Sequence, residues 1–142
     1  MPEPRRYARG LLDTSVVIEL ERFDAVSLPD ELAISTITLA ELAAGPHATT
    51  DADERARRQD RLQRAEATFE PLPFDAAAAR AYGRIYAAVA AVGRKAHGRR
   101  AVDMLVAAIA LSAQLPLLTR NPDDFAGLAG LLVILPVPPA EA

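Results

Sequence analysis

The chain has 142 residues, of which 51% are hydrophobic and 25% charged, a composition typical of one globular domain and not of a disordered or fibrous chain. Sixteen lysines and arginines against nineteen aspartates and glutamates give a net charge of −3, so a nucleic-acid partner must be held by a local basic patch or by metal ions. The absence of cysteine excludes disulfides, thiolate metal sites and a cysteine nucleophile.

The first residues of the chain resemble a targeting signal only in part. Arg5, Arg6 and Arg9 resemble the basic beginning of a signal peptide, but Asp13 and Glu19 interrupt the apolar stretch that should follow. No apolar run approaches the ~18 residues that a membrane helix needs. The sequence therefore predicts a soluble, cytoplasmic protein with no membrane segment.

Apolar periodicity and capping residues predict alternating strands and helices. Thr36 or Thr38 is the predicted cap of the second helix, the Gly45-Pro46 pair its end, and Asp75 the cap of the fourth. In chain order, the predicted elements are strand 9–12, helix 16–23, strand 32–35, a helix that starts after Thr36 or Thr38 and ends at Gly45-Pro46, helix 51–69, a strand at most over 70–74, helix 75–92, helix 101–113, strand 115–119, a loop with a helical turn over 121–130, and strand 131–137.

Short apolar strands separated by helices indicate a parallel sheet that is covered on both faces. Helix 101–113 is apolar on nearly every side and is expected to be central, whereas helix 51–69 balances its acids with arginines and is expected at the surface. We therefore predict an α/β fold: one α/β/α sandwich domain over residues 1–142, with its core at about 11–137 and a mainly parallel sheet of four to five short strands.

Acidic residues stand where the carboxyl ends of the strands should meet, the edge at which open parallel sheets carry function. Asp13 follows the first strand, Glu41 lies early in the helix after the second, and Asp103 lies near the start of helix 101–113. Asp124 belongs to the segment that follows strand 115–119. Because converging carboxylates resist ionisation unless a cation lies among them, the pattern favours a Mg²⁺ or Mn²⁺ site.

Each acid also has a purely structural explanation. Asp13 can be a helix cap, Thr38 and Glu41 have the spacing of a capping box, and Asp103 suits a helix N-terminus. Acids of the 121–124 segment can be solvated loop residues. The joint placement favours a site, and so does Asp103 within the apolar stretch AVDMLVAAIAL, where an unpaired charge is costly.

The segments LLDTSVVIEL, ISTITLAEL, AVDMLVAAIAL and LLTRNPDDF, in that order, resemble the PIN domain family, and most of all its VapC-type toxins. The resemblance spans about residues 11–137. It implies that Asp13, Glu41 and Asp103 are the first three acids of the family's metal site and that Asp124 is the fourth. Many relatives carry an acid where this chain has Asn121, and Asp123 is a further neighbouring acid. Which of these three oxygens reaches the metal stays open, with Asp124 favoured.

The resemblance implies a Mg²⁺-dependent endoribonuclease, with Mn²⁺ as a substitute ion. Asp13 and Asp103 are then expected as direct ligands, Glu41 as a ligand or as the group that orients the attacking water, and Asp124 as completing the site. Hydroxyls of Thr14, Ser15 and Thr119 are expected to orient these carboxylates, with ordinary helix-start and strand-end hydrogen bonding as the alternative.

A basic segment leads into Asp103 and is predicted to bind RNA phosphates, a solvated loop being the alternative. Arg120 is a further phosphate candidate, and His97 is expected as a phosphate contact more than as a metal ligand. The sequence offers no aromatic platform for bases, which favours recognition of RNA shape, with tRNA and rRNA as candidate substrates. The basic residues of the segment are Arg94, Lys95, His97, Arg99 and Arg100.

The resemblance also implies partners: a homodimer and a cognate VapB-type antitoxin, received on apolar side chains of 16–23 and 39–44. Two other classes of function stay open. One is a receiver-like domain that accepts a phosphoryl group beside Mg²⁺, although Lys95 is the only lysine and precedes a helix. The other is a non-catalytic interaction module in which the acids are all caps. A PIN relative acting on DNA is a third possibility.

Overall fold

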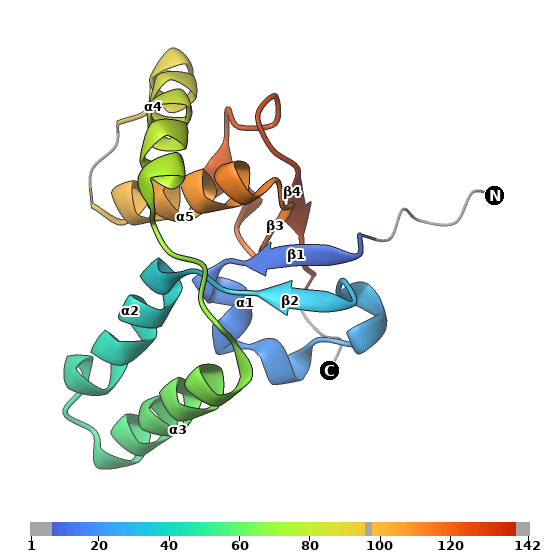
Figure 1. Ribbon diagram of the computed structural model, residues 1–142. Helices are drawn as coiled ribbons and strands as arrows, with labels where there is room; N and C mark the ends of the chain where they lie inside the picture. The colour runs from blue at the N-terminus through green and yellow to red at the C-terminus, as the bar shows by residue number, and fades with distance from the viewer. Residues whose placement is uncertain (1–6, 96–97, 139–142) are drawn as a thin grey trace.

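Figure 1 shows the computed structural model, which describes residues 7–95 and 98–138. Its centre is a four-stranded sheet in the order β2-β1-β3-β4, with every neighbouring pair parallel. The connection from β2 to β3 crosses over β1 and brings β3, from late in the chain, beside β1. The strands are β1 (Arg9–Leu12), β2 (Glu31–Ala33), β3 (Leu117–Thr119) and β4 (Ile134–Pro136).

Helices cover both faces of this sheet. In Figure 1, α4 and α5 lie on one side of the strands, and α1, α2 and α3 lie on the other, which confirms the predicted α/β/α sandwich. The α-helices are α1 (Thr14–Ile18), α2 (Thr36–Ala44), α3 (Ala52–Thr68), α4 (Ala76–Ala91) and α5 (Arg99–Ala113). Short 3₁₀ turns are η1 (Leu20–Arg22), η2 (Ala25–Ser27), η3 (Gly45–Ala48) and η4 (Pro122–Phe125).

The two central strands explain why the sequence shows apolar runs instead of alternation. Leu11 and Leu117 belong to the core under α4 and α5, whereas Leu12 and Leu118 belong to the core that α1, α2 and α3 complete. None of the four is more than 1% exposed. Because successive strand residues face opposite sides of the sheet and both sides are covered, both residues of each leucine pair are buried and apolar.

The possible strand at 70–74 does not form. Leu72 makes only an isolated parallel bridge with Ser35, in which Leu72 N–H bonds to the Ile34 carbonyl and Thr36 N–H to the Leu72 carbonyl. Pro71 and Pro73 lack the N–H groups that a longer ladder would use. The sheet therefore has four strands, the lower end of the predicted range.

Several predicted boundaries are also corrected. Helix 16–23 is wrong in extent, since α1 ends at Ile18 and the chain continues as separate 3₁₀ turns. Helix 101–113 begins earlier, at Arg99, so two residues assigned to a basic loop are helical. Asp75 does cap α4, where its carboxylate accepts a 2.9 Å hydrogen bond from Ala78 N–H.

The cap of α2 is neither of the threonines that were predicted. Ser35 is the N-cap, and its Oγ accepts a 3.0 Å hydrogen bond from Thr38 N–H. Since β2 ends at Ala33, the chain enters the helix earlier than the threonines suggested. Thr38 then lies in the first turn of α2, fully buried, with its hydroxyl free for other contacts.

Among residues 7–95 and 98–138, no helix has the length and apolar character needed to cross a bilayer. The fold brings the residues of the candidate site to the same edge of the sheet. Because all four strands run in parallel, the residues that follow β1, β2 and β3 lie at one edge of the sheet.

Candidate active site

Asp13 leaves β1 at the carboxyl edge and is the N-cap of α1, only 6% exposed. Its carboxylate accepts three hydrogen bonds. Thr14 N–H donates to Oδ1 at 2.8 Å, while Ser15 Oγ and Thr119 Oγ1 donate to Oδ2 at 2.9 Å and 2.8 Å. These donors come from α1 and β3, and they satisfy a buried charge that would otherwise be costly. Asp13 therefore caps α1 and lies at the edge where the site is predicted.

Thr14 connects Asp13 to the second acid. Its backbone holds Asp13, and its hydroxyl donates a 2.7 Å hydrogen bond to Oε1 of Glu41, which comes from the second turn of α2. The capping-box interpretation of Glu41 is therefore wrong, because its carboxylate is turned toward α1. Sequence reasoning also missed the buried hydroxyls of Ser35 and Thr38 beside this contact, although their three-residue spacing was visible.

Asp103 lies in the second turn of α5 and is half-buried. The pKa of its carboxyl is raised to about 7, first by burial and then by the charges of Asp13, Asp124 and, more weakly, Glu41, while Arg99 opposes the shift. Asp13, Asp124 and Glu41 therefore lie within electrostatic reach of Asp103. The tertiary structure brings them together from β1, α2, α5 and η4.

The segment after β3 offers three oxygen-bearing side chains, which the structure places differently. Asp124 is half-buried, and its charge acts on Asp103. Asn121 and Asp123 are exposed. The Asn121 N–H bonds to Thr119 Oγ1 at 3.0 Å, and the Asp123 carbonyl accepts a 2.9 Å hydrogen bond from Arg94. This arrangement favours Asp124, whose role stays a prediction.

The donor chemistry of these acids fits a hard divalent cation. Carboxylate and hydroxyl oxygens suit Mg²⁺ or Mn²⁺ and not a soft metal. Among the described residues, however, no three side chains of the metal-binding types are grouped closely enough to hold an ion as they stand. Like charges without a cation between them repel one another, so the carboxylates would have to draw together to share an ion.

Cationic side chains border this acid cluster. Arg99 and Arg120 line a hollow of about 360 Å³ together with Ser15, Ile18, Glu19 and Asn121. Arg120 forms an ion pair with Glu19, and its guanidinium lies 5.9 Å from the centroid of the Phe23 ring. Nε of Arg100 and Nε of Arg120 are buried, and neither has a hydrogen-bond partner within the described part of the chain.

The other residues that were predicted to bind RNA lie in different structural settings. Arg94 donates to the Asp123 carbonyl, so it ties the end of α4 to η4. Lys95 is exposed beside it. Arg99 and Arg100 lie in the first turn of α5 instead of a loop. His97 lies outside the described residues.

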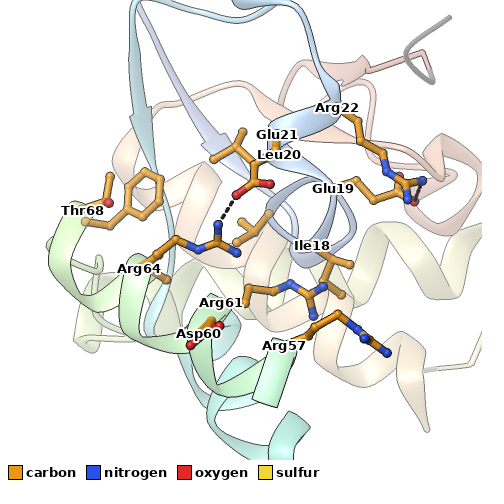
Figure 2. A pocket seen from close by; sticks show the side chains of 13 residues that line it. Ile18, Glu19, Leu20, Glu21, Arg22, Arg57, Asp60, Arg61, Arg64 and Thr68 are labelled. Carbon is orange, nitrogen blue, oxygen red and sulfur yellow. Dashed lines mark hydrogen bonds and ion pairs between the residues drawn. The ribbon is translucent and has the colours of Figure 1, made fainter. Parts of the chain in front are cut away.

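A second hollow, of about 410 Å³, lies between the α1–η1 segment and α3, and Figure 2 shows the side chains around it. Residues 16–23 and 39–44 were both predicted as an apolar surface for the antitoxin, but only the first of these segments lines this hollow. Val16, Val17 and Leu42 are buried in the core, and α3 supplies the opposite wall of the hollow. The lining residues are Val17, Ile18, Glu19, Leu20, Glu21, Arg22, Arg57, Asp60, Arg61, Arg64, Ala65, Thr68 and Phe69.

A parallel α/β/α sandwich with four acids at its carboxyl edge defines a PIN-type protein. The chain belongs to the PIN domain family, whose model matches residues 10–131. It is 41% identical over 126 residues to Ribonuclease VapC5 of Mycobacterium tuberculosis, covering 87% of this chain and 90% of that protein. It is also 31% identical over 132 residues to Ribonuclease VapC of Rickettsia bellii, covering 87% and 93%.

The solved structures agree with the sequence relatives. A crystal structure from Mycobacterium tuberculosis, described as VapBC-5, a member of the VapBC family of toxin-antitoxin systems, superposes with a TM-score of 0.81 and 40% identity. The match covers 92% of this chain and 100% of that one. Within the PIN domain family, these similarities place the chain in the VapC group, as its sequence motifs suggested.

Proposed function

We propose that this protein is a metal-dependent endoribonuclease and the toxin of a VapBC-type toxin–antitoxin pair. The observation that carries the proposal is that Thr14 links Asp13 to Glu41 by hydrogen bonds, while the charges of these acids and of Asp124 act on Asp103. Its support is the similarity, along most of the chain, to proteins named as VapC ribonucleases. Membership of the PIN domain family removes the receiver-like alternative.

Asp13 and Asp103 are proposed to hold a Mg²⁺ ion, for which Mn²⁺ can substitute, with Glu41 and Asp124 completing the site. A divalent ion held by these residues would supply an easily deprotonated water for in-line attack on a phosphodiester and would stabilise charge on the leaving oxygen. The hydroxyls that bond to the acids keep the carboxylate oxygens in position. Thr14, Ser15 and Thr119 have this positioning role.

Arg99 and Arg120 are proposed to bind RNA phosphates beside the acids, because both line the hollow next to Ser15 and Asn121. Lys95 and Arg100 extend this surface toward the start of α5. With no stacking aromatic in the hollow, the substrate would be held by its backbone and shape, as a folded tRNA or rRNA allows.

The hollow between η1 and α3 is proposed to receive a segment of a VapB-type antitoxin. Leu20 and Phe69 supply apolar contacts, and arginines of α3 surround them. The proposal also includes a homodimer acting in the cytoplasm, and a single domain that spans the chain.

The test is cleavage of RNA by the purified protein with Mg²⁺ or Mn²⁺, and with EDTA as the metal-free condition. We expect Asp13→Asn and Asp103→Asn to abolish cleavage while circular dichroism shows a retained fold. Asp123→Asn is the matched control, because Asp123 is an exposed acid of the same edge and should leave cleavage within about twofold. Metal-independent cleavage, or unchanged cleavage in the first two variants, contradicts the proposal. A folded protein with no cleavage of any RNA and no uptake of Mn²⁺ would indicate the interaction module instead.

A further inference from the structure

Behind Glu41 lies a chain of three side-chain hydroxyls that crosses from α2 to α1. Ser35 Oγ lies 3.3 Å from Thr38 Oγ1, Thr38 Oγ1 lies 2.9 Å from Thr14 Oγ1, and Thr14 Oγ1 lies 2.7 Å from Glu41 Oε1. Ser35 and Thr38 are 0% exposed and Thr14 is 5% exposed. Water therefore has little access to these hydroxyls, and the protein itself has to satisfy them.

The chemistry of the groups fixes the direction of every bond in this chain. An ionised carboxylate only accepts, so the single hydroxyl proton of Thr14 goes to Glu41. Thr14 must then accept from Thr38, whose proton is thereby used. Ser35 must in turn donate to Thr38, while Ser35 Oγ accepts from the Thr38 N–H at 3.0 Å. All three protons point toward Glu41.

We propose that Ser35, Thr38 and Thr14 form a one-directional hydroxyl relay that presents the Glu41 carboxylate to the bound metal ion, and that Thr38 is a positioning residue of the nuclease. The inference rests on the proposed function, because the relay matters for catalysis only if Glu41 takes part in metal-dependent cleavage. It adds Ser35 and Thr38, which touch neither the ion nor the RNA, to the residues that shape the site.

The fold by itself does not account for the hydroxyl of Thr38. Capping of α2 uses Ser35 Oγ and the backbone N–H of Thr38, both of which would remain with a valine at this position. Valine has nearly the shape of threonine and would fill this fully buried site. The hydroxyl serves only the relay. Because linked hydrogen bonds polarise one another, removing its second member weakens the bond that Thr14 makes to Glu41.

The same relay controls how the first two acids sit relative to each other. Thr14 holds Asp13 through its backbone N–H and Glu41 through its hydroxyl, so its rotamer sets where the second carboxylate lies beside the first. The bond from Thr38 keeps that rotamer, because a Thr14 hydroxyl with no donor behind it is freer to turn. Loss of the relay therefore affects metal binding and turnover more than RNA binding.

The decisive experiment compares Thr38→Val with Thr38→Ser, measuring Mn²⁺ affinity by calorimetry and RNA cleavage at saturating Mn²⁺. We expect Thr38→Val to lower Mn²⁺ affinity and kcat about tenfold with KM for RNA unchanged, and Thr38→Ser to restore both to within about threefold. Thr36→Val, in the same turn of α2 but outside the relay, is the control for a valine in this helix. Equal kcat and Mn²⁺ affinity in wild type and Thr38→Val would overturn the relay, as would a serine variant as impaired as the valine one.

A second measurement keeps the relay testable even if the protein cleaves no RNA. Neutron diffraction from crystals of the deuterated protein should place the Thr14 deuteron toward Glu41 and the Thr38 deuteron toward Thr14. A Thr38 deuteron directed toward Ser35 would refute the relay whatever the enzyme does. Absence of cleavage and of Mn²⁺ uptake in the wild type, with the deuterons as expected, would instead refute the proposed function and leave the relay as a structural feature.

Discussion

Thr119 Oγ1 donates a 2.8 Å hydrogen bond to Asp13 Oδ2, joining residues 106 positions apart in the chain. The contact exists because β1 and β3 are parallel neighbours and end at the same edge of the sheet. Asn121 N–H in turn donates a hydrogen bond to the Thr119 hydroxyl oxygen, which holds this hydroxyl in position. A strand that enters the sheet late thus positions the acid at the end of the first.

Thr119→Val should lower kcat for RNA cleavage about 10–100-fold, because Asp13 loses one of its two Oδ2 donors and is less firmly held. Thr119→Ser keeps the hydroxyl and is expected to retain most of the activity. Steady-state kinetics with a fluorescent RNA would measure both. If valine and serine variants had equal activity, the hydroxyl would have no role beyond filling space.

The pKa of Asp103 predicts how stability of the metal-free protein depends on pH. Since the pKa is about 7 in the folded protein against an ordinary 3.8, the folded state binds the proton more tightly than the unfolded state. The stabilising contribution is fully present below pH 3.8 and is lost as the pH rises through about 7. Above that, Asp103 is a half-buried charge repelled by its acidic neighbours.

Asp103→Asn should therefore melt a few degrees higher than the wild type at pH 8 in EDTA, and within error of it at pH 4, by differential scanning fluorimetry. The partial exposure of Asp103 keeps the expected difference small. Saturating Mn²⁺ at pH 8 should reverse the order, because only the wild type gains from tight binding of the ion. An asparagine variant that is less stable at pH 8 without metal would show that the carboxylates do not repel one another there.

Arg120 forms an ion pair with Glu19, which would compete with an RNA phosphate for the guanidinium if Arg120 binds RNA as proposed. Arg120→Ala should weaken RNA binding in EDTA and lower the slope of log affinity against log salt by about 1, the loss of one phosphate contact. Glu19→Gln should bind RNA more tightly than the wild type, since Arg120 is released. Fluorescence anisotropy measures both. The proposal requires that RNA affinity falls in Arg120→Ala and rises in Glu19→Gln. Weaker RNA binding in both variants would mean that the ion pair only maintains the shape of the hollow.

The hollow of Figure 2 predicts which side chains bind the antitoxin. Leu20→Ala and Phe69→Ala should weaken binding of the cognate antitoxin at least tenfold and cost less stability than truncation of a fully buried leucine, because both are half-buried at the wall although they also pack on the core. Surface plasmon resonance with the paired antitoxin measures the effect. Leu42→Ala serves as the contrast: it is 5% exposed in the core, so it should cost about 2–5 kcal/mol of unfolding free energy instead.

Much of the fold could be predicted from local patterns in the sequence. Leu11 and Leu12 lie in an apolar run that only a sheet covered on both faces explains, and Asp75 before an alanine-rich stretch marks the start of α4. The errors lie at boundaries that tertiary contacts decide. Residues 70–74 have a strand-like composition, but their prolines leave only the bridge of Leu72 to Ser35.

Composition and the order of motifs indicate which residues could carry the chemistry, because the chain has no cysteine and the motifs single out Asp13, Glu41 and Asp103. The alternation of strands and helices could also be predicted, since hydrophobic period is a local property. The three-dimensional structure was needed to show that the charge of Asp124 acts on Asp103 and that the Thr38 hydroxyl faces Thr14. These outcomes depend on how distant segments pack, and side-chain direction across a sheet edge leaves no trace in the spacing of residues along the chain.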